Sequence, residues 1–445
     1  TNTAEFMVSS PLSDNWGIRL ALFNSEMDKG WLENTAGPTT YTTVDVSQGF
    51  APTVHETRGP VSSHSPQSEL SAGRVTLAGN FSENVFFKLK ASFADNTYAN
   101  MGVSEWYDCT TLGGKPHINT ANPNNPGYLM PIENVGGGEC NKDRRSGANP
   151  IPTTPAAALP ITGQLGGDLG ENYESKIITA HLNVDLDEVF IQTIVNHHEQ
   201  NVGWVIDCDG GASVGCFAGE GNDFENFSIE SKVISKNEGN FNWALGAYYA
   251  NTERYFIQEV IFAGAENSAA DPSNRFVAYD KVSETDGKTI SVYGELIWDM
   301  SDATQITVGA RYIEEEKDSY FTQPYVNPMF GFLFVEGRVL ASKTKLDELV
   351  PELTLRYQPS ENVTYFVAYK EGWKSAGFDN GSIDSTLNAD PIADITYDPE
   401  TVKGVEAGVK AILLDGALNV AFDIYKYEYE DLQLNFFNSA TFAYR

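Results

Sequence analysis

Two adjacent histidines, His197 and His198, have the side chains best suited to hold a metal ion or a haem-like ligand through their ring nitrogens. Trp204 follows them, where a predicted strand runs into a loop. Adjacent residues of a strand point to opposite faces of the sheet, so we expect only one of the two imidazoles to reach any one site. His197, His198 and Trp204 are therefore candidate ligand-binding residues, and ordinary strand positions are the alternative.

The loop after these histidines is rich in carboxylates, whose oxygens are ligands of the kind that Ca²⁺ prefers. Asp207, Asp209, Glu220 and Asp223 lie within it or at its end, around two consecutive glycines. Their spacing lacks the register of a calcium-binding loop, and a solvated acidic loop is the alternative. The sequence thus predicts no required cofactor and no dedicated metal site, and it leaves Ca²⁺ in the acidic loops as a second hypothesis.

Aromatic side chains on loops can stack on a ligand or clamp it. They are better candidates than strand aromatics, because aromatic residues of membrane-spanning strands usually belong to interfacial girdles. Packing among the loops is the alternative role. The loop candidates are Trp106, Tyr107, Tyr325, Phe330, Phe332 and Phe334.

Residues arranged for covalent or acid–base catalysis are missing from the sequence. It contains no GxSxG, no HExxH and no phosphate-binding glycine loop between a strand and a helix. Helical periodicity is also nearly absent. The sequence therefore does not predict an enzyme.

The candidate residues are positioned by segments in which apolar and polar side chains alternate. At 416–432, Leu418, Val420, Phe422 and Ile424 alternate with small or polar residues. One apolar face and one polar face are what a membrane-spanning strand requires. About fifteen such segments are joined alternately by short turns and long loops, as in outer-membrane barrels. The segments are 3–9, 16–24, 69–80, 83–94, 175–186, 188–200, 224–236, 240–253, 288–299, 304–316, 343–358, 362–374, 398–413, 416–432 and 434–445.

Composition and charge narrow the class of protein further. Lysine and arginine total 29 against 61 acidic residues, and a net charge of −32 repels nucleic acid. No apolar run is long enough for a transmembrane helix, and the mean hydropathy is −0.30. A closed barrel is the other way to span a bilayer. We therefore predict an all-β fold, an antiparallel transmembrane β-barrel with short periplasmic turns and long extracellular loops.

The four cysteines form two local pairs, Cys109 with Cys140 and Cys208 with Cys216, each inside its own loop. This arrangement favours disulfides made in an oxidising compartment. A zinc site would need closer pairs such as CxxC, and neither spacing provides one.

Six segments of the chain, in order, resemble TonB-dependent outer-membrane receptors, most strongly the proteobacterial branch of ferric-siderophore-type receptors. The resemblance covers nearly the whole chain. The segments are 8–35, 224–255, 290–317, 364–380, 397–410 and 415–433. Two of them match family motifs through Tyr365, Tyr369, Gly372-Trp373-Lys374 and Gly377-Phe378, and through Pro399-Glu400-Thr401-Val402, Glu406 and Gly408-Val409-Lys410. Ala376 stands where the family usually has the first glycine of a Gly-Gly pair.

The resemblance implies a barrel of about 22 strands with an N-terminal plug that contacts TonB from the periplasm. The plug is not found in the sequence, and by the strand count about seven C-terminal strands are missing as well. We therefore expect residues 1–445 to be a partial outer-membrane barrel domain. The implied function is TonB-dependent active transport of a scarce ligand, such as a ferric siderophore or similar metal chelate. Loops and lumen would bind the ligand, and the plug would gate its passage.

Charged residues at the polar strand positions could guide an anionic ferric chelate through the lumen. Pairing with one another or with plug carboxylates is the alternative. These residues are Arg19, Lys88, Lys90, Arg311, Arg356, Glu406 and Lys410.

The expected location is the outer membrane of a Gram-negative bacterium, with the loops extracellular. The expected partners are the TonB complex, outer-membrane lipid and lipopolysaccharide, the small-molecule ligand and, in one alternative, a surface lipoprotein; nucleic acid is not among them. The alternative functions are an outer-membrane anchor or docking subunit of a surface assembly, and a glycan importer barrel paired with a surface lipoprotein. A secreted, soluble β-rich protein is the third hypothesis.

Overall fold

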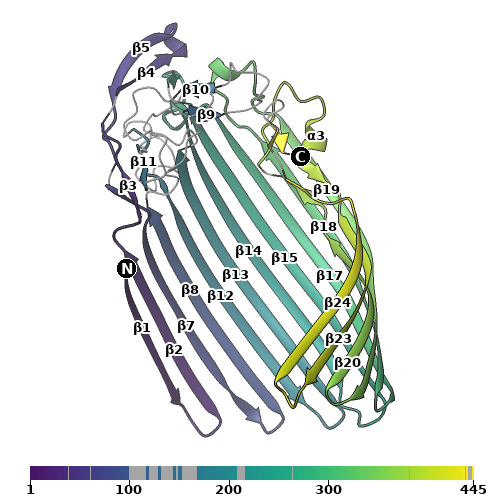
Figure 1. Cartoon of the computed structure of the whole chain (residues 1–445). Helices are drawn as coiled ribbons and strands as arrows, with labels where there is room; N and C mark the ends of the chain where they lie inside the picture. The colour runs from purple at the N-terminus through teal and green to yellow at the C-terminus, as the bar shows by residue number, and fades with distance from the viewer. Residues whose placement is uncertain are drawn as a thin grey trace.

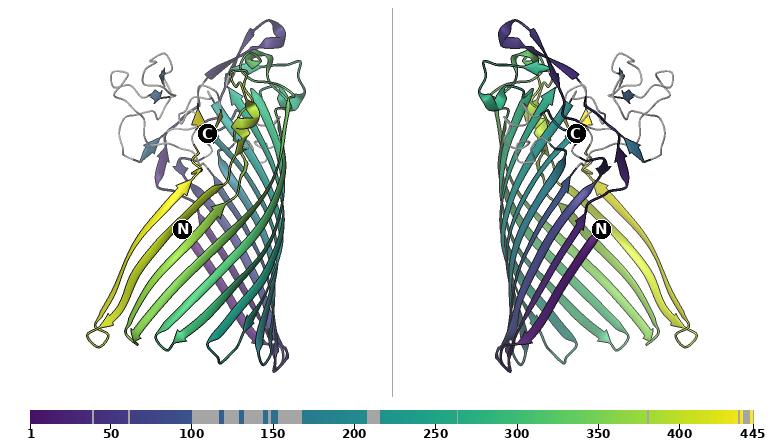
Figure 2. Two further views of the ribbon diagram at one scale, coloured as in Figure 1. Left: turned by 90° about the vertical axis from the view of Figure 1, so that its right-hand side faces the viewer. Right: turned by 90° about the vertical axis from the view of Figure 1, so that its left-hand side faces the viewer.

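The structure, a computed structural model, is built around one 14-stranded antiparallel sheet (Figure 1). The sheet is tilted and curved like the wall of a barrel, and the long loops gather at one end of it (Figure 2). This confirms the predicted all-β fold class. The structure describes residues 1–38, 40–60, 62–99, 117–119, 129–131, 144–146, 149–152, 168–207, 216–262, 264–379, 381–435, 437–438 and 443–444.

The strands of the large sheet are neighbours in the order in which they occur along the chain, so each strand between the two edges pairs with the sheet strand before it and the one after it. They are β1 (Asn2–Pro11), β2 (Trp16–Met27), β7 (Gln67–Ser82), β8 (Val85–Ala99), β12 (Gly170–Asp185), β13 (Val189–Asp207), β14 (Cys216–Ser235), β15 (Phe241–Phe262), β17 (Tyr279–Ser301), β18 (Thr304–Thr322), β19 (Val339–Ser360), β20 (Val363–Lys374), β23 (Glu400–Leu413) and β24 (Leu418–Glu430).

Shorter elements belong to the connections. The strands are β3 (Leu32–Asn34), β4 (Thr40–Asp45), β5 (Ala51–Glu56), β6 (His64–Ser65), β9 (His117–Asn119), β10 (Leu129–Pro131), β11 (Arg145–Ser146), β16 (Ala265–Glu266), β21 (Gly377–Phe378), β22 (Thr396–Tyr397), β25 (Phe437–Asn438) and β26 (Ala443–Tyr444). The helices are the 3-10 turns η1 (Val46–Gln48), η3 (Pro272–Asn274) and η4 (Pro328–Phe330), and α3 (Pro391–Ile395). In the part of the chain that the structure describes, none of the helices is long and apolar enough to cross a membrane.

The two ends of the large sheet differ in the length of their connections. At the turn end, neighbouring strands are joined by a few residues, as at 83–84 and 361–362. At the loop end, the connections are longer, and two of them are 323–338 and 375–399. The alternation of short and long connections is the one that the sequence predicts.

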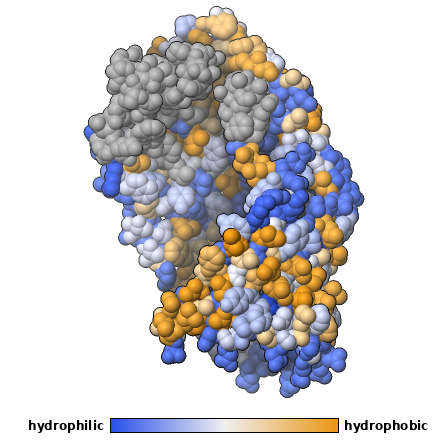
Figure 3. All heavy atoms as spheres, turned by 45° about the vertical axis from the view of Figure 1, so that its right-hand side comes forward, coloured by the Kyte–Doolittle hydropathy of each residue, from blue (hydrophilic) through white to orange (hydrophobic). Residues whose placement is uncertain are grey.

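One face of the sheet is apolar. Residues paired across antiparallel strands point to the same side, and one such row runs through Trp298, Ile306, Leu355 and Val367. Side chains of this face stay exposed, with Val367 at 52% and Phe422 at 63% of full exposure. Apolar residues gather in a zone just above the polar turns (Figure 3). An exposed apolar surface of this extent is what a membrane-spanning wall presents to lipid.

The buried core lies at the loop end, where the connections pack against the ends of the strands. One apolar cluster includes Val205, Phe217 and Ile261, each at most 5% exposed. A second includes Val260, Ala278, Tyr279, Val326, Phe334 and Ile383. The loop end therefore has a buried apolar core like that of a soluble protein, while the rest of the sheet exposes its apolar face on the outside.

Two predictions about strand extent are wrong. Residues 201–223 and 254–286 are predicted as loops, yet β13, β14, β15 and β17 extend well into them. The alternation of apolar and polar residues is weak in these extensions, so the sequence pattern does not mark them although the strand pairing continues. Residues 434–445 are predicted to begin a fifteenth strand, but their described parts, β25 and β26, pair with each other and not with the large sheet.

Candidate functional site

A cavity of about 1110 Å³ lies at the loop end, against the polar face of the sheet. Strands β14, β15 and β20 contribute Glu220, Arg254, Phe256 and Lys374 to its wall. The other wall is formed mainly by residues of the connection 375–399, here called the inward loop. Those residues are Phe378, Asp379, Gly381, Leu387, Asn388, Ala389, Asp390, Ala393, Asp394, Thr396 and Tyr397, and Gln433, Leu434 and Asn435 complete the lining.

The beginning of the inward loop is held by a lysine of β18. The ammonium of Lys317 donates to Ser375 Oγ at 2.6 Å and to the Ala376 carbonyl oxygen at 2.7 Å. Lys317 also forms an ion pair with Glu315 at 3.1 Å. These bonds direct the chain toward the polar face as soon as β20 ends.

Further along, the inward loop is held by strand β17. Lys281 is 1% exposed, and its ammonium donates to the carbonyl oxygens of Gly381 at 2.8 Å and Ser382 at 3.3 Å. Its Nζ also lies 5.4 Å from the centre of the Phe256 ring. A hydrogen bond from a charged donor stabilises more than one between neutral groups. Lys281 therefore holds in place the part of the inward loop that lines the cavity at Gly381.

A third attachment joins the inward loop to the connection 323–338. Asp384 is 2% exposed, and its carboxylate accepts from Arg338 Nε at 2.7 Å. Its backbone N–H donates to Gln323 Oε1 at 2.8 Å, and its carbonyl accepts from Gln323 Nε2 at 3.0 Å. The inward loop is thus bound to the wall and to a neighbouring loop by residues far from it in the sequence.

Burial changes the acid–base properties of two groups beside the cavity. Burial lowers the pKa of Lys281 to about 8, and burial raises the pKa of Asp379 above its ordinary value, although the neighbouring Lys281 and Arg254 oppose that rise. Lys281 lies beyond Asp286 and Lys288 of β17, whose outward side chains are charged, and so outside the apolar band. Both groups therefore belong to the packed loop end.

The cavity offers both aromatic surface and charge. Phe256 and Phe378 are buried, whereas Tyr397 is 42% exposed. Glu220 and Asp379 face Lys281 and Arg254 closely enough for each to influence the pKa of a neighbour. Such a mixture of apolar and charged side chains is typical of a small-molecule site. It does not place a nucleophile next to a base, and so offers no covalent chemistry.

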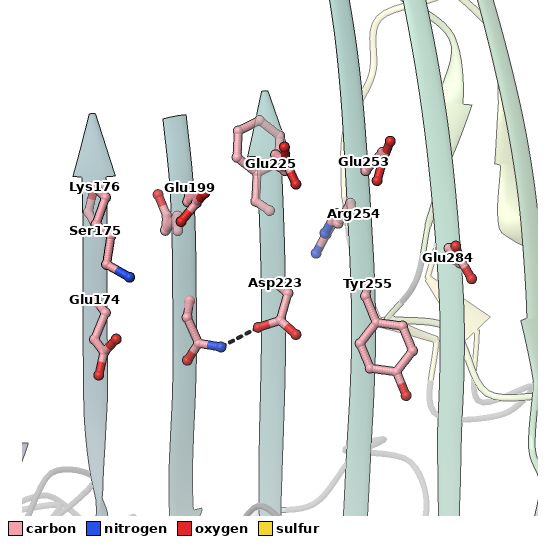
Figure 4. Close-up of a pocket in the computed structure, with 13 residues that line it drawn as sticks. Glu174, Ser175, Lys176, Glu199, Asp223, Glu225, Glu253, Arg254, Tyr255 and Glu284 are labelled. Atoms are coloured by element: carbon pink, nitrogen blue, oxygen red, sulfur yellow. Dashed lines mark hydrogen bonds between the residues drawn. The ribbon is translucent and has the colours of Figure 1, made fainter. Parts of the chain in front are cut away.

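A smaller hollow of about 290 Å³ lies across strands β12 to β17 (Figure 4). Glu199, Glu225 and Glu253 stand opposite one another on adjacent strands at the same height. They share the side of the sheet that is apolar nearer the turn end, because Phe227 and Tyr249 have the same strand parity. Within the described ranges, His, Cys, Asp and Glu side chains nowhere form a group of three that could hold a metal ion.

The two predicted histidines point to opposite faces, as expected for neighbours on β13. On the outer side, His197 Nε2 lies 3.1 Å from Glu199 Oε1. On the polar side, His198 Nε2 lies 3.1 Å from Ser175 Oγ, and its ring packs edge-on against Phe224. Trp204 is partly buried further along β13. None of the three lines the large cavity, and their ligand-binding role stays a prediction.

The predicted loop aromatics divide into buried and exposed residues. Tyr325 is 9% exposed, and its hydroxyl accepts from Asn267 Nδ2 at 3.1 Å. Phe330 packs against Phe262 with ring centres 5.2 Å apart, whereas Phe332 is 71% exposed. Trp106 and Tyr107 lie outside the described residues. Packing among the loops, the alternative role, thus accounts for Tyr325 and Phe330.

All of the predicted lumen charges lie on the polar face. The guanidinium of Arg311 sits 5.6 Å and 5.5 Å from the ring centres of Tyr248 and Tyr293. Glu406 accepts from the Tyr427 hydroxyl at 3.2 Å, and Lys410 lies 6.0 Å from the Phe366 ring. The others share the face by register: Arg19, Lys88, Lys90 and Arg356. None of the seven lines the large cavity, and guidance of a chelate stays a prediction.

Two further predictions fall mainly outside the described residues. Cys216 is disulfide-bonded, but Cys109, Cys140 and Cys208 are not described, so the predicted pairing stays a prediction. For the acidic-loop Ca²⁺ hypothesis, Glu220 and Asp223 lie on opposite faces of β14, since they are three residues apart on a strand. The remaining carboxylates of that hypothesis include Asp209, which is not described.

The sequence did not single out most of the cavity residues. Arg254, Phe256, Asp379 and Tyr397 lie in segments whose alternation is weak or absent. One family motif does point to the cavity, because Lys374 and Phe378 at its end line the cavity and Gly377 adjoins it.

The comparisons agree on the architecture. A model of the family described as TonB dependent receptor-like, beta-barrel matches residues 141–445. Among solved structures, the ferric yersiniabactin uptake receptor of Yersinia pestis aligns with a TM-score of 0.61 at 11% identity, over 97% of this chain and 53% of that one. A curated protein that matches in sequence was not found.

Two further structures align similarly. The ferric-catecholate import receptor of Escherichia coli K12, in its closed form, has a TM-score of 0.56 at 10% identity, over 99% of this chain and 59% of that one. The siderophore receptor PiuA of Acinetobacter baumannii has a TM-score of 0.54 at 14% identity, over 95% of this chain and 56% of that one. At these identities the alignments show a shared fold, and the chain spans little more than half the length of each structure.

Proposed function

Because the chain belongs to the TonB-dependent receptor-like β-barrel family, we propose that this protein imports a ferric siderophore, or a similar scarce metal chelate, across the outer membrane of a Gram-negative bacterium. The family consists of transport receptors and not of enzymes, in agreement with the missing catalytic motifs. In this proposal the loop end faces the outside of the cell, the apolar face contacts outer-membrane lipid, and a plug gated by the TonB complex fills the lumen.

The large cavity is the observation that carries this proposal. It opens on the polar face at the loop end, where a ligand from outside would first meet the barrel. Its volume of about 1110 Å³ slightly exceeds the range of roughly 300 to 1,000 Å³ that is typical for small-molecule sites. The inward loop forms one side of it, so a bound ligand would contact both the wall and a loop. The names of the three aligned structures support the choice of ferric chelates as ligand class.

Uptake by iron-starved cells tests the proposal. Cells with and without the gene would be given radiolabelled iron bound to a tris-catecholate or to a tris-hydroxamate siderophore. We expect deletion of the gene to abolish uptake of at least one chelate, and deletion of TonB to have the same effect. Unchanged uptake of both chelates in the deletion strain would contradict the proposal. A deletion strain that instead lost a surface protein from its membrane would favour the docking function.

A further inference from the structure

Residues 40–56 form a hairpin that leaves the wall between β2 and β7 and reaches the connection between β15 and β17. The hairpin, here called the strap, consists of β4, η1 and β5 and projects beyond the ends of the wall strands (Figure 1). Its strand β4 pairs in parallel with β16, through Val44 with Ala265 and Asp45 with Glu266. The wall strands β8, β12, β13 and β14 lie between β7 and β15. The strap therefore joins two parts of the wall that are roughly 24 Å apart along the sheet, at about 4.8 Å per strand spacing.

The joint between the strap and β16 centres on a buried carboxylate. Glu266 is 4% exposed, and it accepts from the Thr43 hydroxyl at 2.8 Å and from Arg275 Nε at 2.8 Å. The Thr43 hydroxyl has one proton, which it donates to Glu266, so it accepts from His55 Nε2 of β5 at 2.9 Å. A buried carboxylate needs such donors, because an unpaired buried charge is strongly unfavourable. Thr43 therefore ties both strands of the strap to Glu266.

The rest of the joint is also mainly polar. The Val44 N–H donates to the Gly264 carbonyl oxygen at 2.7 Å, and the hydroxyl oxygens of Ser47 and Ser268 lie 3.0 Å apart. Tyr41 packs, partly buried, against an apolar cluster of the loop end. Segments that bury little apolar surface open at a lower free energy than well-packed ones. We therefore expect the joint to open more readily than the apolar clusters beside it.

The connection 263–278, which binds the strap, also binds the connection 323–338. Asn267 directly follows Glu266 and is 8% exposed, and its Nδ2 donates to the Tyr325 hydroxyl at 3.1 Å. An apolar cluster with residues from both connections and from the inward loop adds to this contact. Two adjacent buried side chains, Glu266 and Asn267, thus link the strap to the connection 323–338.

The inward loop is held by two different supports. Lys281 of the wall binds the carbonyl oxygen of Gly381 at 2.8 Å. The following residues are bound by the connection 323–338, where the Leu333 carbonyl oxygen accepts from the Thr386 N–H at 2.8 Å. The first support belongs to the wall, whereas the second belongs to a connection that is itself linked to the strap. Residues 384–386 therefore lie at the end of a continuous series of contacts that begins at the strap.

We propose that the strap is a latch for the loop end. While Thr43 is bonded to Glu266, the connections 263–278 and 323–338 and residues 384–386 of the inward loop stay in place, and when this joint opens they loosen together. The part of the inward loop that the wall holds stays bound. Energetic coupling between distant sites is carried by contiguous contacts, and the contacts above are contiguous. Because the inward loop lines the cavity, the latch controls how firmly one side of the cavity is held, whatever ligand the cavity binds.

Hydrogen exchange of the full protein in detergent tests this coupling. The variant Thr43→Val removes the hydroxyl that binds Glu266 and keeps the shape of the side chain. The matched control is Thr42→Val, because Thr42 precedes Thr43 on β4 and is exposed. A third variant combines Ser47→Cys with Ser268→Cys, so that a disulfide closes the joint covalently where the two hydroxyl oxygens lie 3.0 Å apart. Peptide mapping shows that this disulfide has formed.

In Thr43→Val, exchange should accelerate roughly tenfold or more in peptides from 40–56, 264–270 and 384–386, because a buried carboxylate loses a donor. Exchange at the turn end should stay unchanged, and Thr42→Val should change none of these rates. The disulfide should restore the original rates in Thr43→Val. In the otherwise unmodified protein, it should slow exchange in 384–386.

Acceleration confined to the strap would overturn the coupling, because the strap would then open independently of the inward loop. Exchange in 384–386 that does not respond to the disulfide would overturn it as well, and this result can be obtained even if Thr43→Val does not fold. Equal acceleration in Thr42→Val would show that the Thr43 hydroxyl is not the latch. Each of these outcomes leaves the proposed uptake function standing.

Discussion

The ammonium of Lys281 on β17 donates a 2.8 Å hydrogen bond to the carbonyl oxygen of Gly381, a residue 100 positions further along the chain. Lys281 is fully buried, and burial lowers the pKa of its ammonium to about 8. The ammonium therefore stays mostly charged at neutral pH, although burial makes that charge unfavourable. The loop carbonyls that surround it offset that cost. Lys281 is therefore one of three charged donors, with Lys317 and Arg338, that hold the inward loop at its side of the cavity.

Replacement of this donor should loosen the inward loop. In Lys281→Met, the carbonyls of Gly381 and Ser382 lose a charged donor, and such bonds are worth about 1.5 to 3 kcal/mol each. We expect hydrogen exchange of the amides in 381–384 to accelerate roughly tenfold or more, while exchange in the turn-end strands stays unchanged. Lys288→Met is the control, because Lys288 is on the same strand and exposed on the outer side. Equal exchange in both variants would show that Lys281 does not hold the loop.

The stability of the loop end should depend on the protonation of Asp280. This carboxylate lies at the start of β17, beyond the apolar band, and accepts from the Tyr325 N–H at 2.7 Å. Burial raises its pKa from 3.8 to about 6. A carboxyl group with a raised folded pKa favours folding while both states are protonated, and that contribution is lost as the pH rises from about 4 through about 6.

Asp280→Asn should remove this part of the pH dependence while it keeps an oxygen acceptor for Tyr325. We expect the denaturant midpoint of the unmodified protein in detergent to fall between about pH 4 and pH 7, by the equivalent of about 1 to 3 kcal/mol, and the fall to be smaller in the variant. Asp302→Asn, an exposed substitution at the turn end, should keep the original fall. A midpoint that fell equally in Asp280→Asn would assign the pH dependence to other groups.

The membrane-spanning part of the fold could be predicted from the sequence because lipid imposes a pattern on it. Residues such as Val367 and Leu353 must face lipid while their neighbours face the lumen, and the period of two follows. Beyond the apolar band that constraint ends. Glu220, Gly221, Asn222 and Asp223 are all strand residues of β14, yet their sequence has no apolar face. Backbone pairing alone continues the strand there, and no pattern of apolar and polar residues predicts it.

The candidate cavity was harder to predict, because residues far apart in the chain create it. Lys281, Gln323 and Arg338 each bind the inward loop, and no local pattern links these positions to 381–384. The motif around Lys374 and Phe378 indicates which segment of the chain lines the cavity, but it does not predict the contacts that hold the inward loop. Residue type alone points to His197 and Tyr325 as ligand residues, but the structure places His197 on the outer side and Tyr325 in a packed cluster.

Two phenylalanines of the 323–338 connection should respond differently to truncation. Phe334 is 3% exposed and lies 4.7 Å, centre to centre, from the Tyr279 ring, so Phe334→Ala should destabilise the loop end by about 3 to 5 kcal/mol. Phe332 is 71% exposed, so Phe332→Ala should change stability by less than about 0.5 kcal/mol. Thermal unfolding of the two variants distinguishes them. If Phe332→Ala weakened binding of a ferric tris-catecholate at unchanged stability, the predicted ligand role of this loop aromatic would be supported; unchanged binding would contradict it.

A tyrosine lies across a glycine in the wall of the barrel, and this pair should set the packing of three strands. Tyr293 of β17 is paired with Gly246 of β15, and its hydroxyl reaches over to donate to Glu230 Oε1 of β14 at 2.8 Å. A methyl group on Gly246 would overlap the Tyr293 ring. Gly246→Ala should therefore displace the ring, break the bond to Glu230 and cost about 1 to 3 kcal/mol.

The matched control for this substitution is Gly239→Ala, because Gly239 lies in a turn where an added methyl group meets nothing within 4 Å. Detergent-solubilised variants would be compared by denaturant unfolding. We expect Gly239→Ala to unfold at the original midpoint and Gly246→Ala at a lower one. The three atoms nearest to the added methyl group all belong to Tyr293, so adding Tyr293→Ala should make the Gly246→Ala substitution nearly neutral. A Gly246→Ala penalty that persisted without the ring would place its cause in the backbone of β15 and not in this contact.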